Sequence, residues 1–307
     1  MNLLLRSKIM TDMNNILITG TSGFIGSNFL EFIKSKFPNA TIHTLDKNGS
    51  SNPTYHGDYF SIDLKQRYDV CFHFAAESSV DYSFKYPIET YGNNVMRFLA
   101  FMERNVGRFD NFVYISTDEV YGDKQRGYED SPMMPTNPYA SSKAAAEMVI
   151  HELAHRTKCN YLITRCGNNY GKNQSGKLIP TIFKCLKNDE VFFLDGNGGQ
   201  TRNWVNVIDH CEGILHFYEL FKNVKLKTIN IATTDVFSVN EVIEFAEKMT
   251  GKILKIERVN RRPYNDRCYD ICPKRANRAG FFAKRKFQDY FKELFLNYYE
   301  KEIDSVV

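Results

Sequence analysis

The chain has 307 residues, of which 43% are hydrophobic and 25% charged, and its formal net charge is +4. This composition is typical of a soluble globular protein with one large or two smaller domains, and the charge is too small to indicate a nucleic-acid partner by itself. No run of about 18 apolar residues is present, so no membrane span is expected. The seven cysteines are scattered without a CxxC pair, which favours reduced thiols and a cytoplasmic protein. Residues 1–13 have too short an apolar stretch for a signal peptide, and we expect a loose leader there.

The first expected elements form a nucleotide-binding pattern. A short apolar strand at 15–19 runs into a turn that contains Gly20, Gly23 and Gly26, and an amphipathic helix follows and ends near Lys36. Glycines in such a turn allow a tight bend and a close approach of the backbone to a pyrophosphate, while the helix offers free N–H groups to the phosphates. The spacing departs from GxGxxG, but the strand before it and the helix after it favour a dinucleotide site.

An acidic residue directly follows the second expected strand, at 40–45. Asp46 lies twenty residues beyond Gly26, where a carboxylate can accept hydrogen bonds from an adenosine ribose. An acid at this place repels a 2′-phosphate and therefore favours NAD over NADP. The alternative is a solvated loop aspartate, and the neighbouring Lys47 weakens the argument for the ribose contact.

The remaining elements alternate between strands and helices up to Cys166 and become irregular after it. Strands are expected at 69–75, 112–116 and 160–165, with helices at 87–104 and 139–156. Further helices are expected at 178–187, 207–222, 239–249 and 286–301, and short strands at 192–194, 202–205 and 228–231. The alternation predicts an α/β protein with a doubly wound parallel sheet of the Rossmann type and a smaller α/β substrate lid. We expect an NAD-binding domain at 14–166, to which elements near 204–231 return, and an interleaved nucleotide-sugar domain in most of 167–307.

The chemistry is concentrated around the expected strand at 112–116. Thr117, Asp118 and Glu119 follow it directly, and two acids at the mouth of a buried strand are costly unless the site uses them. Tyr139 and Lys143 follow one helical turn apart, a spacing that by itself is more typical of an ordinary helix face. A lysine at this position favours the phenolate of the tyrosine, whose free pKa of about 10 makes it a poor base at neutral pH.

A rival motif lies on the same expected helix. His151, Glu152 and His155 match the HExxH pattern of zinc proteases. No convincing third ligand follows, and we therefore expect no metal site.

These motifs resemble those of the extended short-chain dehydrogenases/reductases and, within them, the nucleoside-diphosphate-glucose 4,6-dehydratases. The likeness covers nearly the whole chain and rests on segments 20–26, 73–78, 116–122, 139–143, 165–171, 177–180, 202–204 and 262–267. The Thr-Asp-Glu triplet is the most specific, because sugar 4-epimerases of this superfamily usually have small residues in place of the acids, and decarboxylases and GDP-mannose dehydratases tend to show Thr-Ser-Glu. Departures at Ser79, Gly167 and Tyr264-Asn265, and a short 46–73 segment, leave open whether the substrate carries thymine or uracil.

The resemblance implies NAD-dependent dehydration of dTDP- or UDP-glucose to the 4-keto-6-deoxy sugar by a homodimer, without nucleic-acid or membrane partners. It implies these catalytic residues: Thr117, Asp118, Glu119, Tyr139 and Lys143. It implies these cofactor-binding residues: Gly20, Gly23, Phe24, Ile25, Gly26, Asp46, Asp63, Ala75, Tyr139 and Lys143. It implies these substrate-binding residues: Ser78, Asn168, Lys177, Leu178, Arg202, Asn206, Arg262, Asp266 and Arg267. The alternatives are a UDP-sugar epimerase or decarboxylase on the same fold, or a non-catalytic dinucleotide- or RNA-binding relative that uses the basic stretch 252–286.

Overall fold

The computed structural model describes residues 13–49 and 52–300, so residues 1–12 of the expected leader lie outside it, while Met13 is buried. The chain divides into two compact units. The sheet unit contains the described residues up to Thr117 together with 138–165 and 211–229. The second unit contains 118–137, 166–210 and the described residues from Asn230 onward.

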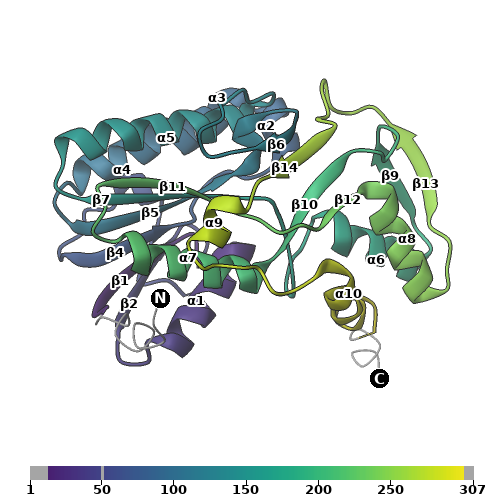
Figure 1. Ribbon diagram of the computed structural model, residues 1–307, viewed down its shortest axis with the longest axis horizontal. Helices are drawn as coiled ribbons and strands as arrows, with labels where there is room; N and C mark the ends of the chain where they lie inside the picture. The colour runs from purple at the N-terminus through teal and green to yellow at the C-terminus, as the bar shows by residue number, and fades with distance from the viewer. Residues whose placement is uncertain (1–12, 50–51, 301–307) are drawn as a thin grey trace. The chain divides into compact units, whose positions relative to one another are not determined.

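The sheet unit is built on a seven-stranded sheet with the order β11-β7-β5-β4-β1-β2-β3 (Figure 1). Its strands are β1 (Asn15–Thr19), β2 (Thr41–Asp46), β3 (Tyr55–His56), β4 (Tyr68–His73), β5 (Phe109–Thr117), β7 (Asn160–Cys166) and β11 (Leu226–Ile231). The pairs β1–β2, β2–β3, β1–β4 and β4–β5 are all parallel. Short apolar runs form these strands because parallel strands are buried on both faces.

Helices cover both faces of this sheet (Figure 1). On one face, α1 (Phe24–Lys36) brings the ring of Phe29 to 4.7 Å from that of Phe72, and α7 (Val207–Phe221) brings Tyr218 to 5.5 Å from the same ring. On the other face lie α4 (Phe98–Arg104) and α5 (Pro138–Arg156), where Phe98, Ile150 and Leu153 pack with Phe112. The prediction of a doubly wound parallel sheet is therefore confirmed: the sheet is mostly parallel and is flanked by helices.

The strand order of the sheet unit has a switch point between β1 and β4. From β1 the chain adds β2 and β3 on one side, and then crosses to β4 and β5 on the other. Ligands of such sheets bind beyond the carboxyl ends of the strands at this switch point, here between β1 and β4. The glycine turn after Thr19 and the loop after His73 begin at that place.

The second unit contains a sheet of the order β12-β10-β14-β6, with β8 paired to β10, and a two-stranded sheet of β9 and β13. Its strands are β6 (Lys124–Gly127), β8 (Asn168–Tyr170), β9 (Val191–Asp195), β10 (Thr201–Asn206), β12 (Val236–Ser238), β13 (Lys255–Val259) and β14 (Cys268–Ile271). Its helices are α6 (Leu178–Asn188), α8 (Val239–Thr250), α9 (Lys274–Arg278) and α10 (Phe287–Phe295), followed by the π-helical η6 (Leu296–Glu300). The apolar faces of α6, α8 and α10 form one core that includes Phe183, Val242 and Phe291.

Most expected elements are present, with two changes in the helices. The helix predicted at 87–104 is interrupted, because α3 (Pro87–Tyr91) and α4 flank the π-helical η4 (Gly92–Arg97). The helix predicted at 286–301 changes to π-helical geometry after Phe295, and residue 301 lies outside the described part. The patterns did not predict β3, β6, β8, β12, β13, β14, the 3₁₀ turns η3 (Tyr59–Ser61) and η5 (Asp118–Tyr121), α9, or α2 (Val80–Lys85). Among the described residues, no helix has the length and apolar character needed to cross a bilayer.

Candidate active site

The glycine turn of the sheet unit forms a cradle in which two backbone segments nearly touch. Gly20 has a φ of +75°, and a Cβ there would lie 2.6 Å from the backbone nitrogen of Ala75. A Cβ on Gly26 would lie 2.2 Å from the carbonyl oxygen of Gly20, so neither position has room for a side chain. The helix α1 begins next to the cradle with Phe24 and Ile25, and it has no acid in its first turn that would occupy its free N–H groups. The cradle thus fits a dinucleotide pyrophosphate.

The acid at the end of β2 turns back toward this cradle. Asp46 is buried, and its two carboxylate oxygens accept hydrogen bonds from the backbone nitrogens of Ser22 and Asn48, each at 2.8 Å. Each oxygen retains a second lone pair that a ribose hydroxyl can use. Asp63, another predicted cofactor contact, precedes β4 and forms an exposed ion pair with Lys65 at 2.6 Å.

The predicted Tyr139-Lys143 pair lies in the first turns of α5. Tyr139 is half-buried, whereas Lys143 is buried and donates from Nζ to the carbonyl oxygen of Ile115 at 2.7 Å. Its ammonium also lies 4.0 Å from the ring centroid of Tyr114. Burial lowers the pKa of Lys143 to about 7, and the negative charge of Glu147 opposes that shift. The lysine is therefore anchored to β5 two residues before Thr117.

A buried ion pair supports this arrangement one turn further along α5. Glu147 is fully buried and accepts from Nε of Arg165 at 3.0 Å and from its Nη2 at 2.5 Å. The hydroxyl of Ser116 donates to the same carboxylate at 2.6 Å. Charge-assisted hydrogen bonds of this kind are shorter and stronger than bonds between neutral groups. The pair thus joins α5, β5 and β7 directly behind Thr117.

The two acids after β5 belong to the second unit, in the 3₁₀ turn η5. Asp118 is buried and Glu119 half-buried. Oε2 of Glu119 accepts from Nδ2 of Asn137 at 2.9 Å and from the hydroxyl of Tyr269 at 3.3 Å. Burial raises the pKa of Glu119, against the lowering effects of the Asn137 hydrogen bond and of the Arg202 charge. A carboxyl group with a raised pKa among neutral donors can change its protonation state.

Two predicted substrate residues near β14 make contacts within the protein. The buried carboxylate of Asp266 accepts from the hydroxyl of Thr136 at 2.6 and 2.7 Å and from that of Tyr269. Arg267 is exposed, and its Nε donates to Oδ2 of Asp123 at 2.8 Å.

The other predicted substrate residues occupy several elements of both units. Arg202 and Asn206 are buried on β10, and Oδ1 of Asn206 accepts from the backbone nitrogen of Ile208 at 2.9 Å. Asn168 begins β8, which pairs with β10. In the second unit, Lys177 is exposed at the start of α6, Leu178 is half-buried on α6, and Arg262 is half-buried before β14. In the sheet unit, Ser78 is exposed before α2.

The HExxH motif lies on α5, where Glu152 pairs with Arg156. Among the described residues no group of three or more His, Cys, Asp or Glu side chains is arranged to hold a metal ion.

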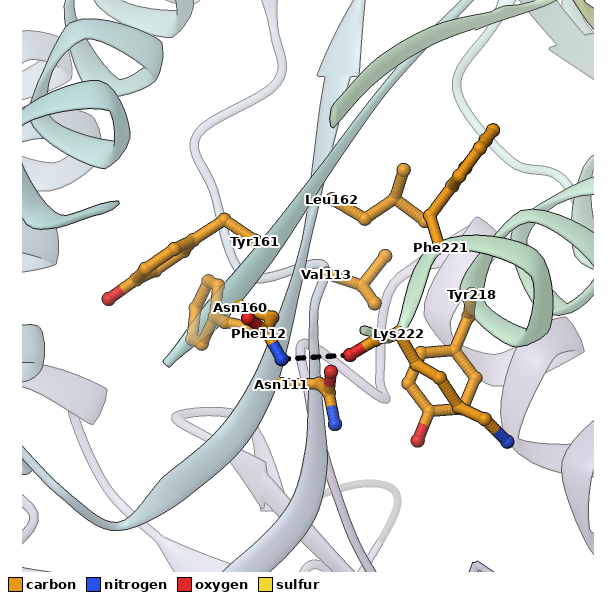
Figure 2. A pocket seen from close by; sticks show the side chains of 9 residues that line it. All are labelled: Asn111, Phe112, Val113, Asn160, Tyr161, Leu162, Tyr218, Phe221 and Lys222. Carbon is orange, nitrogen blue, oxygen red and sulfur yellow. Dashed lines mark hydrogen bonds between the residues drawn. The ribbon is translucent and has the colours of Figure 1, made fainter. Parts of the chain in front are cut away.

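A small pocket of the sheet unit lies apart from the cradle. Figure 2 shows that its lining comes from β5, β7 and α7, with Asn111 and Asn160 near the amino ends of their strands. Nδ2 of Asn160 donates to the carbonyl oxygen of Lys222 at 2.9 Å. Because the cradle and Thr117 are at the carboxyl ends of the strands, this pocket is not part of the candidate site.

Three residues that contact the candidate site residues were not predicted: Thr136, Tyr269 and Glu147. Tyr269 lies three residues after Asp266, in a strand too short for a periodic pattern to reveal. Thr136 is 130 positions from its partner, and no local signal connects them. Glu147 follows Lys143 by one helical turn, and this spacing was the one available signal.

Comparison with known proteins identifies the family. The model of the NAD dependent epimerase/dehydratase family matches residues 16–232. The dTDP-D-glucose 4,6-dehydratase of Homo sapiens is 30% identical, over 92% of this chain and 91% of that protein. A trifunctional protein of Arabidopsis thaliana whose name includes UDP-glucose 4,6-dehydratase is also 30% identical, over 90% of this chain but 46% of its own length. The crystal structure of a dTDP-glucose 4,6-dehydratase from Streptomyces venezuelae with NAD bound has a TM-score of 0.86 and 28% identity, over 94% of this chain and 98% of that one. The resemblance found in the sequence is thereby confirmed, and the chain belongs to the NAD-dependent epimerase/dehydratase family.

Proposed function

We propose that this protein is an NAD-dependent hydro-lyase that converts dTDP- or UDP-glucose to the 4-keto-6-deoxy sugar. The observation that carries the proposal is the acid pair Asp118-Glu119, which follows directly after Thr117 at the carboxyl end of β5. Burial raises the pKa of Glu119, as removal and return of a proton require. Relatives at about 30% identity that carry the names of 4,6-dehydratases support this reading.

The cofactor of the proposal is NAD, which would be held by Gly20, Gly23, Gly26 and Asp46 in the sheet unit. The fit rests on the cradle, where added Cβ atoms at Gly20 and Gly26 would collide with backbone, and on the free N–H groups of α1. When bound there, NAD would supply reversible hydride transfer, first from C4 of the sugar and then to C6.

The residues of the sheet unit would act at C4. Tyr139 takes the proton of the 4-hydroxyl, and the Lys143 ammonium favours the phenolate that this step needs. Thr117 donates a hydrogen bond to the 4-oxygen. Oxidation at C4 makes the C5 hydrogen acidic, and direct elimination from the unoxidised sugar would be slow.

The acids of η5 would act at C5 and C6. Glu119 removes the C5 proton, and Asp118 protonates the 6-hydroxyl as it leaves as water. When hydride is delivered to C6, Glu119 returns a proton to C5, which gives the 4-keto-6-deoxy sugar. The two groups need opposite protonation states, which neighbouring carboxyl groups readily adopt. Arg202, Asn168, Lys177 and Arg267 would hold the diphosphate and sugar by charge-assisted hydrogen bonds.

The test is incubation with dTDP-glucose and UDP-glucose in turn, followed by mass spectrometry of the sugar nucleotide. We expect the loss of one water from at least one of them, without any added oxidant or reductant. An epimerised or decarboxylated product, or a need for external redox reagent in proportion to product, would overturn the proposal.

We also propose a cytoplasmic homodimer without a nucleic-acid partner. In the family that the sequence resembles, the helices equivalent to 87–104 and 139–156 pair across a two-fold axis. Several apolar residues of these segments, including Phe98, Met102 and Leu153, are buried in the core of the sheet unit and cannot contact a partner. The proposal rests instead on Met96 and Met148, which are 64% and 47% exposed on η4 and α5, two elements that pack on each other. Light scattering should give the mass of a dimer, and a Met148→Lys variant should shift it toward the monomer.

A further inference from the structure

The proton-abstracting acid of the proposed reaction shares a hydrogen-bond donor with a second buried acid. The hydroxyl of Tyr269 lies 3.3 Å from Oε2 of Glu119 and also contacts Oδ2 of Asp266. A phenol carries one proton, so it can donate to one of these carboxylates at a time. The two acids therefore compete for the same donor.

Several contacts hold Tyr269 and Asp266 in this arrangement. Tyr269 and Asp266 are buried, and the guanidinium carbon of Arg202 lies 4.2 Å from the centroid of the Tyr269 ring. Nη1 of Arg202 donates to the carbonyl oxygen of Asp266 at 3.1 Å rather than to its carboxylate. The Thr136 hydroxyl also donates to the carboxylate of Asp266, so Asp266 depends less on the hydrogen bond from the Tyr269 hydroxyl.

We propose that Tyr269 and Asp266 are positioning residues for Glu119, which orient its carboxylate and divide a single phenol proton between the two acids. This inference rests on the proposed function, in which Glu119 removes the C5 proton. When Tyr269 donates to Glu119, it stabilises the ionised carboxylate that acts as base. When Tyr269 donates to Asp266, Glu119 becomes a better proton acceptor. The Asp266 charge disfavours ionisation of Glu119, and the Arg202 charge favours it.

The two positioning residues should affect the pH dependence of the reaction in opposite directions. Glu119 must be ionised to act, so dehydration falls as the pH drops through its pKa. Tyr269→Phe removes a donor to the carboxylate and raises that pKa, which moves the acid limb of the rate profile to higher pH. Asp266→Asn removes a negative charge and lowers the pKa, which moves the limb to lower pH. We expect each shift to be roughly half to one pH unit.

The experiment measures single-turnover dehydration, followed by mass spectrometry of the quenched sugar, between pH 5 and 9. Bound NAD and circular dichroism confirm that each variant is folded. Tyr264→Phe is the matched control, because its exposed hydroxyl contacts Asp123 at 3.1 Å and should leave the limb unchanged. If Asp266→Asn does not fold, Thr136→Val replaces it. This variant removes a hydrogen-bond donor to Asp266, so the Tyr269 hydroxyl donates to Asp266 more often and to Glu119 less often. We then expect the acid limb to move to higher pH, as in Tyr269→Phe but by less.

Unshifted limbs, or shifts in the same direction for Tyr269→Phe and Asp266→Asn, would overturn the positioning role. The failure of the proposed function looks different. In that case the Glu119→Gln variant would dehydrate the sugar at a near-normal rate. The assignment of Glu119 as base would then be lost, whatever the pH profiles of Tyr269→Phe and Asp266→Asn show.

Discussion

Each of the two units holds a glutamate that the proposed chemistry involves, and the surroundings of the two carboxylates differ. In the sheet unit, Glu147 accepts hydrogen bonds from Nε and Nη2 of the Arg165 guanidinium and another from the hydroxyl of Ser116. In the second unit, the partners of Glu119 include the amide of Asn137 and the phenol of Tyr269, which are neutral. Burial raises the pKa of Glu119.

This difference indicates what each acid is for. Removal of either partner of a buried ion pair leaves an uncompensated charge in the interior, so Glu147 is suited to holding α5, β5 and β7 together. Burial favours the neutral form of Glu119 and so makes its carboxylate a better proton acceptor. The central claim is therefore that Glu147 is structural and Glu119 reactive, although the two side chains are chemically identical.

The largest expected effect on stability comes from breaking the ion pair. Glu147→Gln leaves the buried Arg165 without its counter-charge, and we expect a loss of about 3–5 kcal/mol in the free energy of unfolding. Glu119→Gln should retain or increase stability at pH 7, because an acid with a raised pKa destabilises the folded state when it is ionised. Urea unfolding measures both.

The control for this prediction is Glu152→Gln on the same helix. Glu152 is exposed and paired with Arg156, and such surface pairs contribute about 0–1 kcal/mol. A Glu147→Gln variant as stable as this control would show that the buried pair does not support the sheet unit.

A second prediction concerns the cradle, which, like the ion pair, belongs to the sheet unit and tolerates little change. Gly26→Ala places a Cβ about 2.2 Å from the Gly20 carbonyl oxygen, so the turn must shift, and purified protein should carry little NAD. Gly92→Ala is the control, since a Cβ there meets nothing within 4 Å. The measurement is the amount of NAD per protein chain, assayed after denaturation has released it. Full NAD content in Gly26→Ala would contradict the cradle as the cofactor site.

A third and smaller effect separates the hydrogen bond from the ion pair. Ser116→Ala removes one donor at 2.6 Å from Glu147 but leaves Arg165 in place, so we expect a loss of about 1.5 kcal/mol. Ser35→Ala, which removes an exposed hydroxyl on α1, should change stability by less than about 0.5 kcal/mol. If the two serine variants are equally stable, the Ser116 bond adds nothing to the pair.

The sheet unit could be predicted from sequence because its signals are local. Apolar runs gave β1, β4 and β5, and the glycine spacing after Thr19 indicated the cradle. Most short strands of the second unit could not be predicted, because β6 and β14 have four residues each and are defined by partners far along the chain. The π-helical turn η4 has no recognisable pattern in residues 92–97.

The candidate site divides in the same way. The Thr117-Asp118-Glu119 triplet and the Tyr139-Lys143 spacing were visible as motifs. The shared donor of Glu119 and Asp266 was not, because Tyr269 lies 150 positions after Glu119 and is brought to it by tertiary structure alone.

Exchange of the C5 hydrogen in deuterated water tests the central claim most directly. Glu119→Gln and Glu147→Gln are compared with the wild type at a temperature where both variants are folded, and each is incubated with the sugar nucleotide. Reduced-cofactor absorbance reports C4 oxidation, and mass spectrometry of the sugar reports deuterium at C5. We predict that Glu119→Gln retains oxidation but loses exchange by about 10²- to 10⁴-fold, whereas folded Glu147→Gln still exchanges. Normal exchange in Glu119→Gln, or its selective loss in Glu147→Gln, would contradict the assignment.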